Sequence, residues 1–324
     1  LGPAACPSLK RMEREVVEMA MGLQHVPEEG AASMTSGGSE SIFLAVKACR
    51  DWSRSNMPVE GVPQIVAPYS AHPAFDKAAH LLGLEVVRVP LSDGLLADVS
   101  AMNQAISRRT IMMVGSAPCF PYGLIDPISE LSTLAQEHGL WLHVDACVGG
   151  YLNPFVAALG VTLPDYDFRL PGVTSMSADL HKYGYAAKGA STVLYRHKSH
   201  REAQVFHFDD WPCGHMYTPT LAGTRPGGAI AAAWAVLNYL GWEGYKAKAA
   251  RILAAREQLL AGLAELELRV FGDPQLSIVA FGAAPDEDLD MLAVGEGLYQ
   301  DGWFSSRVRN PDGVQVMISP EHDR

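Results

Sequence analysis

Short apolar segments alternate along the first half of the chain with stretches in which apolar residues recur every three or four positions. The short segments are typical of buried strands, and the three-to-four periodicity is typical of helices with one buried face. The strands predicted in this way are residues 64–67, 84–90, 111–115 and 140–146, and the helices are residues 8–23, 73–83, 98–107 and 126–139. This alternation predicts an α/β fold with a mostly parallel sheet and helices on both of its faces.

The pattern changes after about residue 241. Residues 244–267 form one long amphipathic pattern, and residues 275–281 and 314–319 resemble short strands on either side of a further helix. We therefore predict a large domain over residues 1–242, then a connecting helix and a small C-terminal α+β domain over residues 243–324. The last residue, Arg324, follows no closing element, and we expect this second domain to be incomplete.

Composition and charge exclude several classes of protein. Hydrophobic residues make up 48% of the chain and the formal net charge is -11, which argues against a nucleic-acid-binding protein with its basic surface. A local basic cluster could still bind an anionic substrate. The five cysteines are scattered without a CxxC pair, and the longest apolar run, residues 229–242, is too short to cross a bilayer. No signal peptide is recognisable, and we expect a cytoplasmic protein.

A glycine-rich segment, residues 36–40 (SGGSE), comes directly before a predicted helix. The backbone N–H groups at a helix N-terminus can bind an anion, so this segment is either an anion site or a plain turn with a serine cap. Its spacing matches neither the nucleoside-triphosphate loop nor the dinucleotide-binding motif.

A carboxylate ends the apolar strand of residues 140–146. Asp145 there either caps the next turn or faces a cation, such as a protonated ring nitrogen, in a cleft. His143 lies on the same face of the strand, but no third ligand is nearby, so a metal site is not expected. His72 precedes Pro73 at another junction between a strand and a helix, at the same rim of the predicted sheet.

Two lysines flank an aromatic and small-residue stretch in residues 177–191 (SADLHKYGYAAKGAS), before a further apolar run. Lys182 and Lys188 are either surface charges or a catalytic amine and an anion clamp. A glycine-rich anion site, a strand-end aspartate, a rim histidine and a His-Lys pair would together hold a phosphorylated pyridinium aldehyde. In that case the lysine of the His-Lys pair forms the Schiff base and the aspartate keeps the ring nitrogen protonated.

Six segments then resemble one family: TSGGSES, SAHPAFDKAAH, GSAPCFPYGLIDPI, HVDACVGGY, SADLHKYGYAAKG and TPTLAGTRPGG. In this order they resemble the sphingosine-1-phosphate lyases, which are fold-type I pyridoxal-phosphate (PLP) enzymes related to the group II decarboxylases. The resemblance runs from the first helix to about residue 240 and weakens afterwards. It implies a PLP-dependent transferase-like fold, PLP as the cofactor, and a homodimer with active sites at the interface.

The resemblance also implies roles for single residues. Lys182 is the Schiff-base lysine, Asp145 is the partner of the pyridinium nitrogen, and His72 stacks on the cofactor ring. The cofactor phosphate is held by Gly38 and Ser39, assisted by His181 and Ser116. Further residues are implied outside the cofactor. Lys188 and Tyr122 contact the phosphate of the substrate, with Tyr122 reaching across the dimer interface toward the neighbouring site. Arg225 orders the loop near the cofactor.

The implied reaction is that of an aldehyde-lyase. A phosphorylated long-chain amino alcohol is cleaved by a retro-aldol step to a fatty aldehyde and phosphoethanolamine, with Lys182, Tyr183 or Tyr185 as the base. The alternatives are a PLP-dependent amino-acid decarboxylase and a non-catalytic scaffold of the same fold. The upstream segment of the family, which contacts the substrate phosphate, and the membrane anchor of its eukaryotic members do not occur in the printed sequence.

Overall fold

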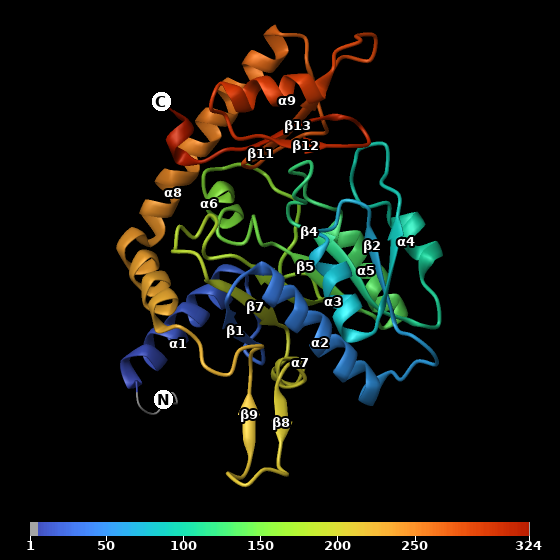
Figure 1. Ribbon diagram of the computed structural model, residues 1–324, viewed down its shortest axis with the longest axis vertical. Coiled ribbons are helices and arrows are strands. Elements are labelled where there is room, and N and C mark those ends of the chain that lie inside the picture. Colours follow the sequence, from blue (N-terminus) through green and yellow to red (C-terminus); the bar gives the residue numbers. More distant parts are fainter. Residues whose placement is uncertain (1–5, 324) are drawn as a thin grey trace.

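A seven-stranded sheet forms the centre of the protein, seen in a computed structural model that describes residues 6–323 (Figure 1). Five neighbouring strands run parallel, and β7 is antiparallel to both of its neighbours. The predicted mostly parallel sheet is therefore confirmed. The spatial order is β1 (Ala31–Thr35), β7 (Ser191–Tyr195), β6 (Val173–Ala178), β5 (Trp141–Asp145), β4 (Thr110–Ser116), β2 (Gln64–Pro68) and β3 (Glu85–Val89).

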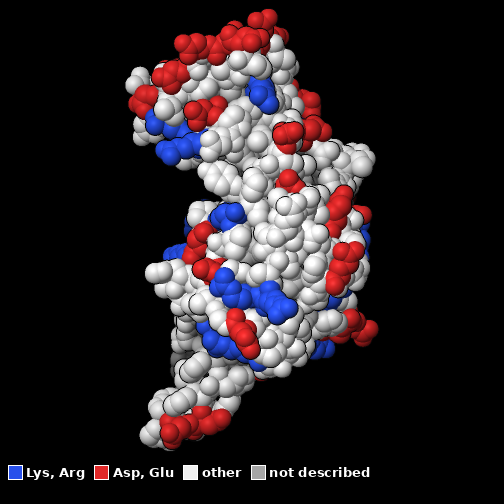
Figure 2. Space-filling model, turned by 90° about the vertical axis from the view of Figure 1, so that its right-hand side faces the viewer, with Lys and Arg blue, Asp and Glu red and all other residues white. Residues whose placement is uncertain are grey.

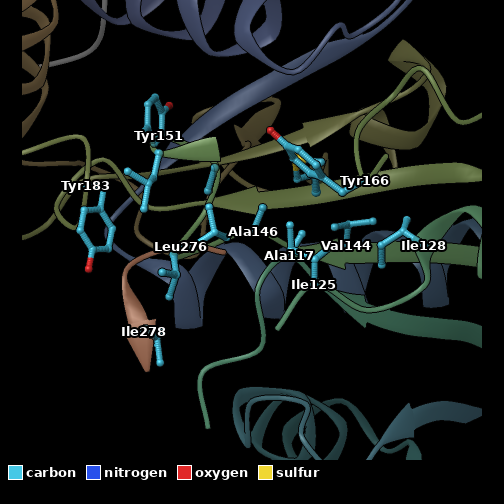
Figure 3. Packing of buried hydrophobic residues seen from close by; sticks show 14 of the residues in the cluster. Ala117, Ile125, Ile128, Val144, Ala146, Tyr151, Tyr166, Tyr183, Leu276 and Ile278 are labelled. Atoms are coloured by element: carbon cyan, nitrogen blue, oxygen red, sulfur yellow. The ribbon is translucent and has the colours of Figure 1, made fainter. Parts of the chain in front are cut away.

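Helices cover both faces of this sheet because successive strand residues point to opposite sides. Trp141 belongs to a core with α2 (Gly38–Asn56) and α3 (Ala74–Leu82), whereas Leu142 belongs to the core on the other face. Figure 3 shows part of that second core, in which Val144 of the sheet lies near Ile128. Its helices are α1 (Pro7–Leu23), α4 (Val99–Ala105), α5 (Ile128–His138), α6 (Asn153–Ala157) and α8 (Gly227–Glu265).

A second, four-stranded sheet is built from the end of the chain and lies at the top of Figure 1. Helix α8 runs toward it along one side of the molecule and is interrupted at Gly241, where φ is 55° and ψ is -173°. This break adjoins the predicted boundary at residue 242. The two-domain division stays a prediction, and its outer limits, residues 1 and 324, lie outside the described residues. The elements are β10 (Arg269–Val270), β11 (Ile278–Gly282), α9 (Met291–Gln300), β12 (Ser306–Val308), β13 (Gly313–Met317) and a final 3-10 turn (Pro320–Asp323).

Tyrosine side chains join the second sheet to the first. The hydroxyl of Tyr183 donates to the carbonyl of Ile318 at 2.7 Å, and Figure 3 shows this ring near Leu276 and Ile278. The buried Tyr122 hydroxyl lies 3.0 Å from the carbonyl oxygens of Arg309 and of Asn310. The loops that follow β4 and β6 are thus attached to the C-terminal part of the chain.

A β-hairpin projects from the opposite end of the molecule (Figures 1 and 2). It consists of β8 (Phe206–Phe208) and β9 (Met216–Thr218), and it follows the short helix α7 (Lys198–Glu202). Figure 2 shows acidic residues at its tip and few charged side chains along its stem. This hairpin does not occur among the predicted elements, because a hairpin that buries little leaves a weak alternation of apolar and polar residues.

Candidate active site

A cavity of about 370 Å³ opens at the edge of the large sheet where the parallel strands end. This edge is where ligands of parallel sheets bind. The cavity brings together most of the residues predicted for the cofactor. Its lining includes Ser36, Gly37, Gly38, Ser39, His72, Asp145, Cys147, Asp179, His181 and Lys182.

The glycine-rich segment forms the wall of the cavity at the start of α2. This helix begins at Gly38, inside the segment that was predicted to precede it, and the N–H and Oγ of Ser36 both donate to the carboxylate of Glu40, at 2.7 and 2.5 Å. A Cβ atom on Gly38 would lie only 2.7 Å from Cys147 Sγ and 2.8 Å from Asp179 Oδ2, so only glycine fits here. The first N–H groups of α2 have no partner within the helix and can bind an anion.

Asp145 closes the floor of the cavity as the last residue of β5. Its Oδ1 accepts hydrogen bonds from the Cys147 N–H at 3.0 Å and from Ser177 Oγ at 3.1 Å. Burial raises the pKa of Asp145, but the nearby Lys182 ammonium and the Cys147 hydrogen bond outweigh it, and the pKa lies below its ordinary value. The carboxylate is therefore ionised at neutral pH and can hold a proton on a ring nitrogen.

His143 supports this carboxylate through a buried hydrogen-bond chain. Its ring nitrogens lie 2.8 Å from Ser175 Oγ and 3.2 Å from Ser177 Oγ, and Ser177 Oγ in turn donates to Asp145. Burial lowers the pKa of His143 to about 4, so the ring is neutral. Within residues 6–323 no group of three or more His, Cys, Asp or Glu side chains is arranged to hold a metal ion.

Lys182 lies beside Asp179, with its Nζ 3.1 Å from Asp179 Oδ2. Burial lowers the pKa of Lys182, but Cys147, Asp179 and Asp145 more than offset it, so the pKa is raised. Cys147 acts on Lys182 only as a thiolate, and burial raises the pKa of this thiol well above its ordinary value. At neutral pH the two aspartates are therefore the groups that favour the lysine ammonium.

Asp179 is a site residue that the sequence interpretation missed, and it is almost fully buried. Its signal was present in the sequence, because it stands three residues before Lys182 and ends an apolar and small-residue run as Asp145 does. His181, the neighbour of Lys182, places its Nε2 3.6 Å from Asp179 Oδ2. Burial lowers the pKa of His181 against the opposing effect of Asp179, while Lys188 and Lys182 lower it further.

Two predicted residues, His72 and Lys188, are exposed. His72 is exposed and lines the cavity, and its Nδ1 accepts a hydrogen bond from the Ala74 N–H at 3.0 Å, which fixes the ring at the start of α3. Lys188 is exposed in the loop before β7, close enough to His181 to act on its pKa. A ligand in the cavity could meet His72 on one side, and Lys188 is free to reach a ligand group outside it.

Three further predicted residues are not among those that line the cavity. Ser116 pairs with Asp145 across β4 and β5, but its N–H donates to Asp126. Tyr122 is buried, and its hydroxyl is bonded within its own chain, as described above. Arg225 forms an ion pair with Glu13 of α1 and thereby ties its loop to the first helix.

The two tyrosines predicted as alternative bases also point away from the cavity. Tyr183 is buried against the C-terminal part of the chain, and Tyr185 stacks on Tyr245 of α8 with Lys248 over its ring. Burial raises the pKa of both phenols, which weakens them as bases at neutral pH. Among the three predicted candidates, only Lys182 lines the cavity.

Comparison with known proteins identifies relatives of this chain. Residues 3–284 match the pyridoxal-dependent decarboxylase conserved domain. Sphingosine-1-phosphate lyases of Arabidopsis thaliana and of mouse are each 42% identical over 97% and 100% of this chain, which spans 58% and 56% of their lengths. A solved sphingosine-1-phosphate lyase of Burkholderia pseudomallei superposes with a TM-score of 0.93 at 41% identity, covering 98% of this chain and 74% of that chain.

The cavity fits pyridoxal phosphate, the cofactor of this family. The N-terminus of α2 with Gly38 suits its phosphate, the ionised Asp145 suits its ring nitrogen, and Lys182 suits its aldehyde. The buried Asp179 Oδ1, which has no hydrogen-bond partner within residues 6–323, adds to the signs of a site built for a ligand. The fold-type I resemblance inferred from the six motifs is confirmed, and the chain belongs to the pyridoxal-dependent decarboxylase family as a relative of the sphingosine-1-phosphate lyases.

Proposed function

We propose that this protein is a pyridoxal-phosphate-dependent carbon–carbon lyase that cleaves a phosphorylated long-chain amino alcohol. The products are a fatty aldehyde and phosphoethanolamine. The observation that carries the proposal is the cavity that joins Lys182, Asp145 and the N-terminus of α2. The 41% identity to a lyase that superposes over 98% of this chain supports the choice of reaction.

The residues of the cavity divide the chemistry among them. When bound, pyridoxal phosphate supplies a ring that accepts the electrons released as the C2–C3 bond breaks. Asp145 keeps a proton on the ring nitrogen, and the first N–H groups of α2 bind the phosphate. Lys182 Nζ, once neutral, takes the proton of the C3 hydroxyl and returns a proton to C2 after the aldehyde has formed.

Product analysis tests this proposal directly. We expect sphingosine-1-phosphate to yield a long-chain aldehyde and phosphoethanolamine, whereas a panel of amino acids yields no carbon dioxide. Release of carbon dioxide from an amino acid, without aldehyde from the phosphorylated amine, would instead identify a decarboxylase, the activity named in the family description. A protein that takes up no pyridoxal phosphate and forms neither product would be a scaffold.

Lys188 is the proposed contact for the substrate phosphate, because it is exposed and close enough to His181, a residue that lines the cavity, to lower the pKa of that ring. A hydrogen bond to a charged group contributes about 1.5–3 kcal/mol. We therefore expect Lys188→Ala to raise the KM for the phosphorylated substrate by roughly 10–100-fold. The absorbance of bound pyridoxal phosphate should not change. Steady-state kinetics test this, with Lys198→Ala on α7 as a control that removes an exposed lysine elsewhere. An unchanged KM in the Lys188 variant would contradict the substrate assignment.

We also infer that the protein is a homodimer with its active sites near the interface, as the resemblance to the sphingosine-1-phosphate lyases implies. The projecting hairpin supports this inference, because Phe206 and Phe208 stack on each other and remain 53% and 47% exposed. Clustered exposed apolar residues of this kind mark interaction surfaces.

The double variant Phe206→Asp/Phe208→Asp is expected to halve the mass measured by light scattering, because charges on the hairpin disfavour its burial. Asp210→Asn at the hairpin tip serves as the control and should keep the mass of the wild type. A wild-type monomer, or a double variant that stays dimeric, would contradict the use of this hairpin in a dimer.

We propose a cytoplasmic location, since the cysteines among the described residues are free thiols. Within residues 6–323 no helix has the length and apolar character needed to span a bilayer. Cell fractionation tests the location, and recovery of the protein outside the cytoplasm would contradict it.

A further inference from the structure

We propose that Asp179 is the positioning residue that holds the Lys182 ammonium whenever the lysine is not bonded to the cofactor. The inference rests on the proposed function, because it assigns Lys182 to the cofactor. Asp179 follows β6 directly, and its side chain is 2% exposed. Its Oδ2 lies 3.1 Å from Lys182 Nζ, which makes a close and buried ion pair.

Backbone hydrogen bonds fix the positions of Asp179 and Lys182 relative to each other. The N–H of Lys182 donates to the carbonyl of Asp179 at 3.3 Å, so that one turn presents both side chains to the cavity. The N–H of Asp179 donates to the carbonyl of Cys147 at 3.3 Å, which ties the turn to the loop after Asp145. The carboxylate is thus fixed relative to both the lysine and the floor of the cavity.

The second carboxylate oxygen of Asp179 lies in an environment that destabilises the folded protein. Oδ1 is buried and has no hydrogen-bond partner within the described part of the chain, and a Cβ on Gly38 would lie 3.0 Å from it. Burying a carboxylate without full hydrogen bonding is unfavourable. A neutral side chain of similar size would avoid burying a charge but would hold an ammonium less strongly.

The pairing has two consequences for Lys182. A lysine must lose its proton before its nitrogen can attack an aldehyde, so Asp179 raises the pH at which the cofactor attaches. During turnover, once Lys182 Nζ has taken the proton of the C3 hydroxyl, Asp179 would hold the resulting ammonium in a fixed position from which that proton can be returned to C2. Asp145 would hold the proton of the ring nitrogen when the cofactor is bound, and so would not serve this purpose.

The rate at which the purified apoprotein takes up pyridoxal phosphate tests the proposal without any substrate. The rate is followed by absorbance from pH 6 to pH 9.5. We expect Asp179→Asn to move the midpoint of this profile to lower pH and to speed uptake at pH 7 by roughly tenfold, the size expected for losing a hydrogen bond between charged groups. Asp179→Glu, which keeps the charge, should move the midpoint back toward that of the wild type.

Asp167→Asn is the matched control, because Asp167 is also buried and bonded to a cation, Arg169, but does not line the cavity. It should leave the midpoint unchanged. If the asparagine variant does not fold, Asp179→Ser removes both the charge and the unpaired oxygen and is measured in the same way. An unshifted midpoint, or a shift to higher pH, overturns the role of Asp179.

The two proposals can fail separately. A shifted midpoint together with carbon dioxide as product would leave Asp179 in its role and overturn the lyase. Aldehyde as product together with an unshifted midpoint would support the lyase and overturn the role of Asp179. A wild-type protein that takes up no pyridoxal phosphate at any pH would overturn both.

Discussion

Replacing Lys182 with alanine is expected to remove both the covalent attachment of pyridoxal phosphate and the proton transfer at the reacting carbons. Among the proposed bases, it alone lines the cavity. Losing a general base usually slows a reaction by about 10²–10⁴-fold, and we expect the lyase activity to fall by at least that factor. Aldehyde release measures the activity, and absorbance after desalting measures the retained cofactor.

Lys182→Arg separates the loss of the reactive amine from the loss of its positive charge. Arginine keeps a positive charge beside Asp179 and Asp145, so the cavity stays electrostatically balanced, but it does not lose its proton at accessible pH. We expect this variant to be as inactive as Lys182→Ala while unfolding at a denaturant concentration close to that of the wild type. An arginine variant that kept most of the activity would exclude Lys182 as the covalent and basic residue.

Asp145→Asn is expected to produce the second-largest loss, for a different reason. The asparagine can still accept hydrogen bonds from the Cys147 N–H and from Ser177, so the strand end should keep its geometry. It cannot supply the negative charge that holds a proton on the ring nitrogen, and the ring then accepts electrons poorly. We expect activity to fall by roughly 10²–10⁴-fold, comparable to the loss of a catalytic proton transfer.

The cofactor should remain attached in Asp145→Asn, because Lys182 is intact. Absorbance of the desalted protein checks this, and retained cofactor with a loss of turnover distinguishes this variant from Lys182→Ala. Asp126→Asn provides a comparison, since Asp126 is equally buried at the sheet edge but accepts the backbone N–H groups of Ala97 and Ser116 instead of lining the cavity. Equal losses of activity in the two variants would contradict a specific role for Asp145.

The predictable part of the fold is the part with strong periodicity. The apolar run at residues 140–146 became β5, and the periodic stretch at residues 126–139 became α5, each within a few residues of the prediction. Strand β1 has the sequence AASMT, whose small and polar residues show neither period, and it is defined by pairing with β7 far along the chain. The break in α8 at Gly241 lies where the sequence pattern changes, but the pattern did not reveal that helix continues on both sides of it.

The predictable part of the site is the part located at strand ends. Asp145 and Lys182 follow apolar strands, so their place at the edge of the sheet follows from the parallel topology. The directions of Tyr183 and Tyr185 depend instead on packing against α8 and the second sheet, which spacing along the chain does not reveal. The spacing of Asp179 from Lys182 was visible in the sequence, but the contact between their side chains depends on the turn that follows β6.

The hydrogen bond from Tyr183 to Ile318 carries a mechanical consequence. Because α8 is interrupted at Gly241, this helix does not act as one rigid rod between the two sheets. Besides the Tyr122 contacts, the C-terminal part of the chain is therefore held to the first sheet through Tyr183, the residue that follows Lys182 in the chain. We expect a shift of the C-terminal strands to be transmitted to the backbone of Lys182, the proposed Schiff-base lysine, because a single peptide bond joins it to Tyr183.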